Sequence, residues 1–259
     1  MSNYWARRLE AAQQIAYDTS QKAINKRLKK YYQSLASRVV ADYESVYTQL
    51  LAATQAGEEI SPAKLYQLDK YWQMQGQLRG QLNKFGEKQI AQLTKQFEIM
   101  YFETYYSLQL DGLTAYTTID NKAVQQIINQ IWCADGKSWS QRIWENTQLL
   151  KETLDEGLIH CIVTGKKTTE LKNILQERFN VSYSRADTLV RTELAHIQTQ
   201  AAQQRYKDYG IAEVEVLVEK DERLCDICRP NNGKRYKINE RMPVPFHPNC
   251  RCCMIPVVE

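Results

Sequence analysis

Apolar side chains recur every three or four positions through the first half of the sequence, which predicts long helices. Residues 5–53 contain neither proline nor glycine, and one helix face would carry a stripe of Leu28, Tyr32, Leu35, Val39, Tyr43, Val46 and Leu50. A second such stripe runs through residues 63–110, where Gly86 suggests a kink. Two long helices joined by a short loop are expected to pack as an antiparallel hairpin, because each buries the apolar face that the other needs.

Shorter helical patterns occupy the middle of the chain, and the period changes near the C-terminus. Asp120 is expected to cap one helix, and separate helices are expected over residues 138–165, 168–179 and 184–210. The stretch EVEVLVE then alternates as a strand does.

The fold class predicted from these patterns is mostly α, with three consecutive parts. Residues 1–112 would form a long helical hairpin arm, and residues 113–210 a helical domain. Residues 211–259 would form a small α+β module that holds a Cys/His cluster.

Composition adds to this picture mainly by exclusion. Hydrophobic residues make up 43% and charged residues 25% of the 259 positions, a profile of globular proteins. No apolar run reaches the roughly 18–20 residues of a membrane span, and the N-terminal MSNYWARRLE lacks the apolar core of a secretory signal. We therefore expect a cytoplasmic protein without a membrane partner. The net charge of +4 permits contact with nucleic acid without requiring it.

Most of the cysteines lie in two short motifs near the C-terminus, CDICRPNNGKRY and PFHPNCRCC. A pair of thiolates two residues apart can share one metal ion, and a second pair one loop away can complete a tetrahedron. This spacing is typical of a structural zinc site. Because the intervening segment is turn-rich and buries little, a metal crosslink would supply stability that its core cannot.

The ligand set is open at this point, since the second motif offers four candidates for two places. The favoured sets combine Cys225, Cys228 and Cys250 with either His247 or Cys252. Two alternatives to zinc remain: thiols packed as small apolar side chains, and disulfides formed on oxidation.

A second constellation is Arg191-Thr192-Glu193, with His196 on the same helix face as Glu193. It could be an acid and base pair, or a buried polar network that orients the helix. The network is favoured, because no nucleophile or phosphate-binding loop accompanies the pair. No catalytic residue is therefore predicted. The alternative function is a metal-dependent hydrolase or nuclease using Glu193, His196 and the cysteine cluster; a thiol redox protein using Cys225 and Cys228 is weaker still.

Basic residues crowd the C-terminal module and predict weak, salt-sensitive binding of double-stranded DNA without sequence preference. The predicted DNA contacts are Arg223, Arg229, Lys234, Arg235, Lys237, Arg241 and Arg251.

The order of VRTELAHIQTQAAQQRYKDYGI, DERLCDICRPNNGKRY and PFHPNCRC resembles the C-terminal domain of phage head morphogenesis proteins, the Mu F-like minor capsid family. The stretch WCADGKSWSQRIWENTQLL is similar to members from Firmicutes phages and prophages. The resemblance covers about residues 125–255, and Asn231-Asn232 and Cys253 depart from the pattern. The positions that match the family motif are Arg191, Thr192, Glu193, Asp221, Cys225, Cys228, Gly233, His247, Pro248, Cys250 and Cys252.

The resemblance implies a minor head protein encoded beside the portal gene. Such a protein would associate with the portal and with capsid or scaffold, and with packaged or ejecting DNA. It would reside in the virion, at the capsid interior or portal vertex, and in the host cytoplasm during assembly. Self-association through the N-terminal helices is a further expectation. Some relatives carry an additional toxin or ADP-ribosyltransferase domain; since the sequence stops at Glu259, none is expected here.

Overall fold

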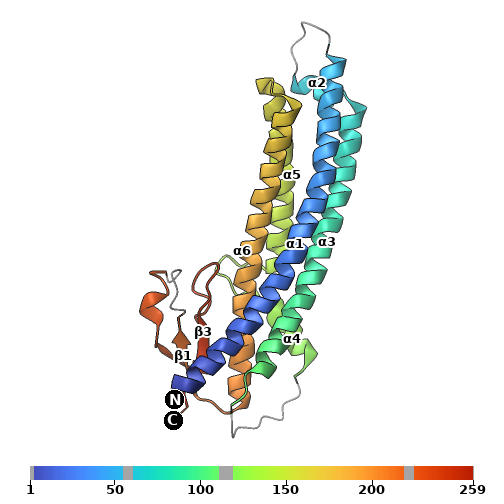
Figure 1. Ribbon diagram of the computed structural model, residues 1–259. Coiled ribbons are helices and arrows are strands. Elements are labelled where there is room, and N and C mark those ends of the chain that lie inside the picture. The colour runs from blue at the N-terminus through green and yellow to red at the C-terminus, as the bar shows by residue number, and fades with distance from the viewer. Residues whose placement is uncertain (1–2, 55–60, 111–118, 219–224, 259) are drawn as a thin grey trace. The chain divides into compact units, whose positions relative to one another are not determined.

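The computed structural model describes residues 3–54, 61–110, 119–218 and 225–258, and most of them are helical (Figure 1). The predicted class, mostly α with a small C-terminal α+β module, is confirmed. The helices are α1 (Asn3–Ala53), α2 (Pro62–Tyr66), α3 (Asp69–Ser107), α4 (Asn121–Ile128), α5 (Trp139–Thr164) and α6 (Thr168–Asp208). In the part of the chain that is described, no helix is long and apolar enough to cross a membrane.

The chain divides into two compact units that interleave along the sequence. Unit 1 contains Met1–Asn25, Gln92–Trp139 and Thr188–Glu259, and unit 2 contains Lys26–Ala91 and Ser140–Asp187. Helices α1, α3 and α6 contribute segments to both units. This division groups residues by spatial proximity rather than by consecutive sequence, so the expected three-part division at residues 112 and 210 stays a prediction.

Unit 2 is helical, and the predicted apolar stripe of α1 forms part of its core. All seven stripe residues, from Leu28 to Leu50, are buried. The rings of Tyr32 and Phe85 meet edge to face at 4.9 Å, and Lys70 Nζ donates to Ser45 Oγ at 2.6 Å. Position 32 therefore faces position 85 while position 45 faces position 70, which confirms the antiparallel hairpin of α1 and α3 within this unit.

Helix α6 is continuous where two separate helices were expected, so that prediction is wrong. Neither glycine nor proline interrupts residues 168–208, and the polar residues near position 182 bond to neighbouring helices instead of ending α6. Asn146 of α5 donates to the carbonyl of Ser182 at 2.9 Å, and the Ser182 hydroxyl lies 3.4 Å from the Tyr32 hydroxyl of α1. Hydrogen bonds to other helices thus satisfy polar groups that, from the local sequence alone, predicted the end of a helix.

Helix α3 runs without interruption through Gly86, whose role is close packing. A Cβ atom at Gly86 would lie 2.5 Å from the ring of Trp144 on α5, whereas one at Gly80 would meet nothing within 4 Å. We expect Gly80→Ala to raise the free energy of unfolding by about 1 kcal/mol, because alanine is the better helix former. Gly86→Ala should lower it by about 1–2 kcal/mol, because the indole must move. Urea denaturation of both variants checks this; changes of equal sign would contradict the packing role.

Unit 1 contains a small antiparallel sheet of order β2-β1-β3. The strands are β1 (Glu213–Leu217), β2 (Arg235–Lys237) and β3 (Cys253–Pro256), and a 3₁₀ turn, η1, spans Arg229–Asn231. Val214 of β1 pairs with Tyr236 on one side and with Pro256 on the other. The alternating pattern of β1 buries Val214 and Val216, as predicted for a strand with one face on a core.

The sheet packs on the first turns of α1 and the last turns of α6. Leu9, Ala202 and Tyr206 share a buried cluster with Val214 and Met254. Gln13 Nε2 and the Tyr206 hydroxyl both donate to the Met254 carbonyl, at 2.9 and 3.2 Å. These bonds satisfy part of the outer edge of β3, so the module is anchored to helices distant in sequence.

Candidate metal centre

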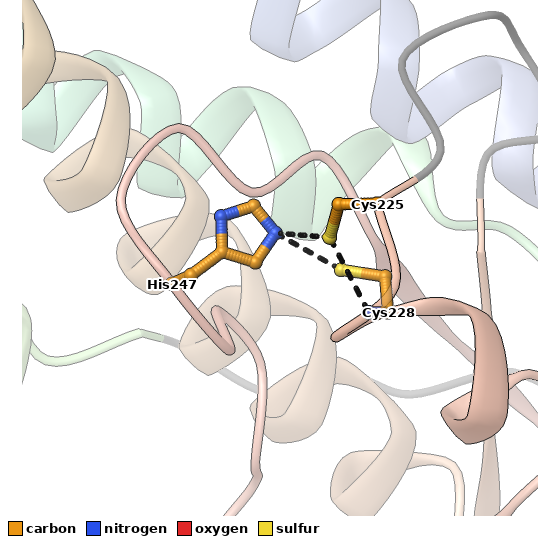
Figure 2. Close-up of side chains that lie close together, drawn as sticks. All are labelled: Cys225, Cys228 and His247. Atoms are coloured by element: carbon orange, nitrogen blue, oxygen red, sulfur yellow. Dashed lines mark hydrogen bonds between the residues drawn. The ribbon is translucent and has the colours of Figure 1, made fainter.

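The first cysteine motif forms a tight turn just before η1. The Cys228 N–H donates to Cys225 Sγ at 3.3 Å, and the Arg229 N–H donates to the Cys225 carbonyl at 3.1 Å. A turn closed in this way places the two sulfurs, which are separated by two residues, on the same side of the chain (Figure 2).

The second motif forms another turn, which leads into β3. The Cys250 N–H donates to the His247 carbonyl at 3.2 Å, and Asn249 adopts the left-handed conformation with φ of 61°. Asparagine tolerates this conformation better than most residues, because its short side chain can bond locally. Cys250 and Cys252 are both buried and belong to the same apolar cluster as the sheet.

The two turns bring all five predicted ligands together. His247 Nε2 lies 3.1 Å from Cys225 Sγ and 3.0 Å from Cys228 Sγ (Figure 2). Cys228 Sγ lies 3.8 Å from Cys250 Sγ. Two triads result, one of Cys225, Cys228 and His247 and one of Cys228, Cys250 and Cys252, and within each the ligand atoms lie within 4.8 Å of one another. Within each triad the spacing suits donors that surround one small cation, and Cys228 is common to both triads.

Hydrogen bonds and burial push the thiols of this cluster toward different protonation states. The hydrogen bond from Cys252 lowers the pKa of Cys250 to about 5, and the same contact, with burial, raises the pKa of Cys252. The backbone N–H of Cys228 lowers the pKa of Cys225, and burial raises the pKa of Cys228 to about 12. The site thus favours negative charge on the Cys225 and Cys250 sulfurs, where a cation would be attracted.

Glu193 and His196 of α6 form a separate arrangement with Trp132, which was not predicted from the sequence. The Trp132 Nε1–H donates to Glu193 Oε2 at 2.9 Å, and the Trp132 and His196 rings stack at 4.3 Å between centroids. Burial, and secondarily the charge of Arg241, lowers the pKa of His196 to about 4. Arg241 also donates to the Trp132 carbonyl. Within the described residues, neither Glu193 nor His196 joins a potential metal-binding group.

The Arg191-Thr192-Glu193 turn is connected to the second cysteine motif. The Asn249 N–H donates to Thr192 Oγ1 at 3.2 Å, and Thr192 Oγ1 donates in turn to the Thr188 carbonyl at 2.8 Å. On its other side, the Tyr17 hydroxyl of α1 donates to the Arg191 carbonyl at 3.2 Å. Thr192 therefore supports the left-handed residue between His247 and Cys250, a role that motif spacing alone does not reveal.

The remaining predicted positions lie at the surface of the module or outside the described residues. Asp221 and Arg223 belong to the latter group. Gly233 has φ of 78°, a conformation that suits glycine, in the turn before β2, and Pro248 is exposed beside His247.

The predicted DNA-contacting residues that are described differ in their surroundings. Those exposed around η1 and β2 are Arg229, Lys234, Arg235 and Lys237. Two of these also pair with carboxylates at the surface, Arg229 with Asp226 at 3.8 Å and Arg235 with Glu215 at 3.5 Å. Arg251 pairs with Asp18 of α1 at 3.6 Å, and Arg241 donates to the Trp132 carbonyl.

Comparison with known proteins finds similarity to a known protein family in the C-terminal part of the chain. Residues 152–255 match the family described as Phage Mu protein F like protein, which confirms the predicted family resemblance over that stretch. A curated relative, "NAD(+)--arginine ADP-ribosyltransferase EFV" of Enterococcus faecalis (strain ATCC 700802 / V583), is 24% identical over 281 residues, covering 99% of this chain and 55% of the relative. The chain thus spans about half the length of that relative. No solved structure matches.

Proposed function

We propose that this Mu F-like chain is a structural protein of a tailed-phage or prophage head that associates with the portal and the procapsid. The observation that carries the proposal is the family match over residues 152–255, which spans both cysteine motifs and the Arg191-Thr192-Glu193 turn. The long helices α1, α3 and α6 provide extended surfaces for docking on other head proteins.

The proposal assigns the chain no enzymatic activity, and the surroundings of Glu193 and His196 support this. The carboxylate of Glu193 accepts the Trp132 indole N–H, and His196 is 6% exposed beneath the same indole. His196 and Trp132 line a cavity of about 550 Å³, but the described residues around it include no serine, threonine, cysteine or lysine that could act as a nucleophile. The transferase activity named for the relative belongs to a protein of about twice this length, of which the chain covers 55%.

The assembly role is tested by coexpression with the portal and major capsid proteins of the same phage. We expect the chain to sediment with procapsids and to copurify with the isolated portal. Absence from procapsids would overturn the proposed role. Incubation with NAD⁺ as donor and an arginine analogue as acceptor provides a separate check: transfer of ADP-ribose to the guanidine, with release of nicotinamide, would contradict the non-enzymatic assignment.

We further propose that the exposed basic residues near η1 and β2 contact double-stranded DNA without sequence preference. Arg229 has a side chain that is 66% exposed, and Lys237 is exposed on the outer strand β2. Removing one cation that touches a phosphate should make the slope of log K against log salt shallower by about 0.9. A variant with Arg229→Gln and Lys237→Gln should therefore show a slope smaller by about 2, whereas Lys84→Gln with Lys88→Gln on α3 should not. No binding by the wild type at low salt would remove the DNA role.

A further inference from the structure

We propose that the C-terminal module binds one Zn²⁺ ion through Cys225, Cys228, His247 and Cys250, with Cys252 next to Cys250 but outside the coordination sphere. The inference concerns the chemistry of the module and holds independently of the head role. It is carried by the direction of one imidazole, by one sulfur–sulfur distance and by the architecture of two turns.

The imidazole of His247 is oriented as a metal ligand. Its Nδ1 lies 2.7 Å from the Pro248 carbonyl oxygen, and because a carbonyl only accepts, Nδ1 carries the proton. Nε2 of the neutral ring then holds a lone pair, and it faces Cys225 Sγ at 3.1 Å and Cys228 Sγ at 3.0 Å (Figure 2). A histidine whose second nitrogen donates to a carbonyl while the first faces two sulfurs has the arrangement found around zinc.

The distance between Cys228 and Cys250 fits a shared ion. Two sulfurs that each lie about 2.3 Å from a tetrahedral zinc are about 3.8 Å apart, and the observed separation is 3.8 Å. The nitrogen–sulfur separations are shorter than the roughly 3.5 Å of a filled tetrahedron, so entry of the ion would move His247 outward by about half an ångström. His247 is only half-buried and can make that movement.

The backbone distinguishes Cys250 from Cys252. Cys225 and Cys228, like His247 and Cys250, flank a closed turn that presents both ligands on one side. Cys252 follows the second turn, immediately before β3, and its sulfur lies within 4.8 Å of the Cys228 and Cys250 sulfurs. It is therefore a close neighbour of the site but does not flank a closed turn with another ligand. On this geometry we assign Cys250 to the coordination sphere and Cys252 to its immediate surroundings, where neighbouring groups tune a metal-bound thiolate.

The experiment begins with reduced wild-type protein. We expect one zinc per chain by elemental analysis, and a cobalt-substituted form with visible absorption of a tetrahedral site. The intensity of the near-ultraviolet cobalt–sulfur absorption should correspond to three thiolates. Intensity for four thiolates would overturn the assignment of His247, and this measurement requires no variant to fold.

Variants then separate the ligands from their neighbours. His247→Ala and Cys225→Ser should weaken cobalt binding by more than about 100-fold, whereas Cys252→Ser should weaken it by no more than the roughly 10–100-fold of a supporting group. Cys253→Ser is the matched control, since Cys253 lies outside both triads and should leave binding unchanged. Wild-type affinity in His247→Ala with loss of binding in Cys252→Ser would establish a four-thiolate site instead. The proposal would be overturned entirely if the protein bound neither zinc nor cobalt in the presence of a reductant. A Cys225–Cys228 disulfide that persists under reducing conditions would overturn it as well.

Discussion

Between pH 7 and pH 5 the wild-type protein is expected to lose about 2 kcal/mol of unfolding free energy that a His196→Phe variant keeps. The pKa of His196 falls from 6.5 to about 4 in the folded protein, because burial disfavours the imidazolium and Arg241 adds a like charge. In the unfolded chain the ring regains its ordinary pKa. Acid therefore protonates the unfolded state first, and stability is lost as the pH falls from about 6.5 toward 4.

The groups around His196 make phenylalanine a suitable replacement. Arg241 is the charged group that acts on His196, and Glu240 lines the same cavity. The Glu193 carboxylate accepts from the Trp132 indole, which stacks on the His196 ring. His196 Nε2 is buried without a hydrogen-bond partner, so removing it leaves no donor or acceptor stranded. Phenylalanine keeps a ring against Trp132, whose stacking contact is 4.3 Å between centroids.

Chemical denaturation at several pH values, with the difference between the two proteins plotted against pH, measures the effect. The subtraction cancels the carboxylates and the acid sensitivity of the cysteine cluster, which both proteins share. His160→Phe serves as the control, because His160 is exposed on α5 and its replacement should leave the pH dependence close to that of the wild type. A wild-type curve parallel to that of His196→Phe would show that the folded protein readily accommodates the charged ring.

The parts of the fold that the sequence predicted correctly are those governed by local period. The apolar residues from Leu28 to Leu50 recur with the period of an α-helix, and those around Val214 and Val216 alternate with the period of a strand. Each pattern alone therefore predicts which side chains are buried. The two-residue spacing of the cysteine motifs likewise follows from the reach of a single turn. These features depend on neighbours a few positions away and need no knowledge of the tertiary structure.

The features that were missed depend on contacts between residues far apart in sequence. Helix α6 continues past Ser182 because Asn146 and Tyr32, 36 and 150 positions away, bond to it. Trp132 meets Glu193 across 61 positions, and Thr192 meets Asn249 across 57. No periodicity encodes such pairs. The choice among the candidate ligands also depends on the folded chain, because His247 Nε2 meets the Cys225 and Cys228 sulfurs, 22 and 19 positions away, only once both motifs are folded.

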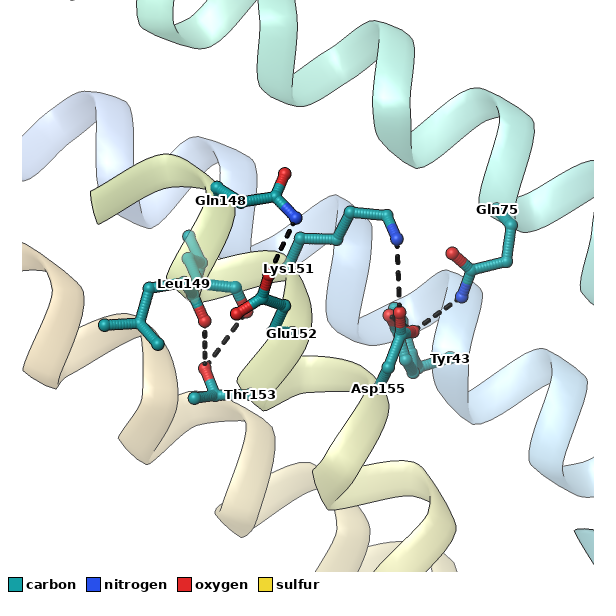
Figure 3. Close-up of polar contacts among 9 residues, drawn as sticks. Tyr43, Gln75, Gln148, Leu149, Lys151, Glu152, Thr153 and Asp155 are labelled. Atoms are coloured by element: carbon teal, nitrogen blue, oxygen red, sulfur yellow. Dashed lines mark hydrogen bonds and ion pairs between the residues drawn. The ribbon is translucent and has the colours of Figure 1, made fainter. Parts of the chain in front are cut away.

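A hydrogen-bond network in unit 2 gives the second large effect, an expected coupling of about 1.5–3 kcal/mol between Tyr43 and Asp155. Tyr43 is fully buried, and its hydroxyl donates to Asp155 Oδ1 (Figure 3). The same oxygen accepts from Gln75 Nε2 at 2.6 Å, and Lys151 Nζ lies 3.4 Å from Asp155 Oδ2. Burial, reinforced by the Asp155 charge, raises the pKa of Tyr43, so the hydroxyl remains a donor across the working pH range.

Asp155→Ala should cost about 3 kcal/mol, because it leaves the Tyr43 hydroxyl and the Gln75 amide without their acceptor. Tyr43→Phe alone should cost about 1–2 kcal/mol, since the carboxylate keeps Gln75 and Lys151. In the double variant the stranded hydroxyl is gone, so its cost should fall short of the sum of the two, and urea unfolding of the four proteins gives the coupling.

The exposed pair Lys166 and Glu170 on the same unit provides the matched control. Their side chains are 38% and 44% exposed and lie 3.0 Å apart, so water screens the charges and the same cycle should return about 0.5 kcal/mol or less. If the Tyr43 and Asp155 costs simply add, the hydroxyl gains no more from this carboxylate than from water. The network would then contribute to the position of α5 against α1 through its packing alone.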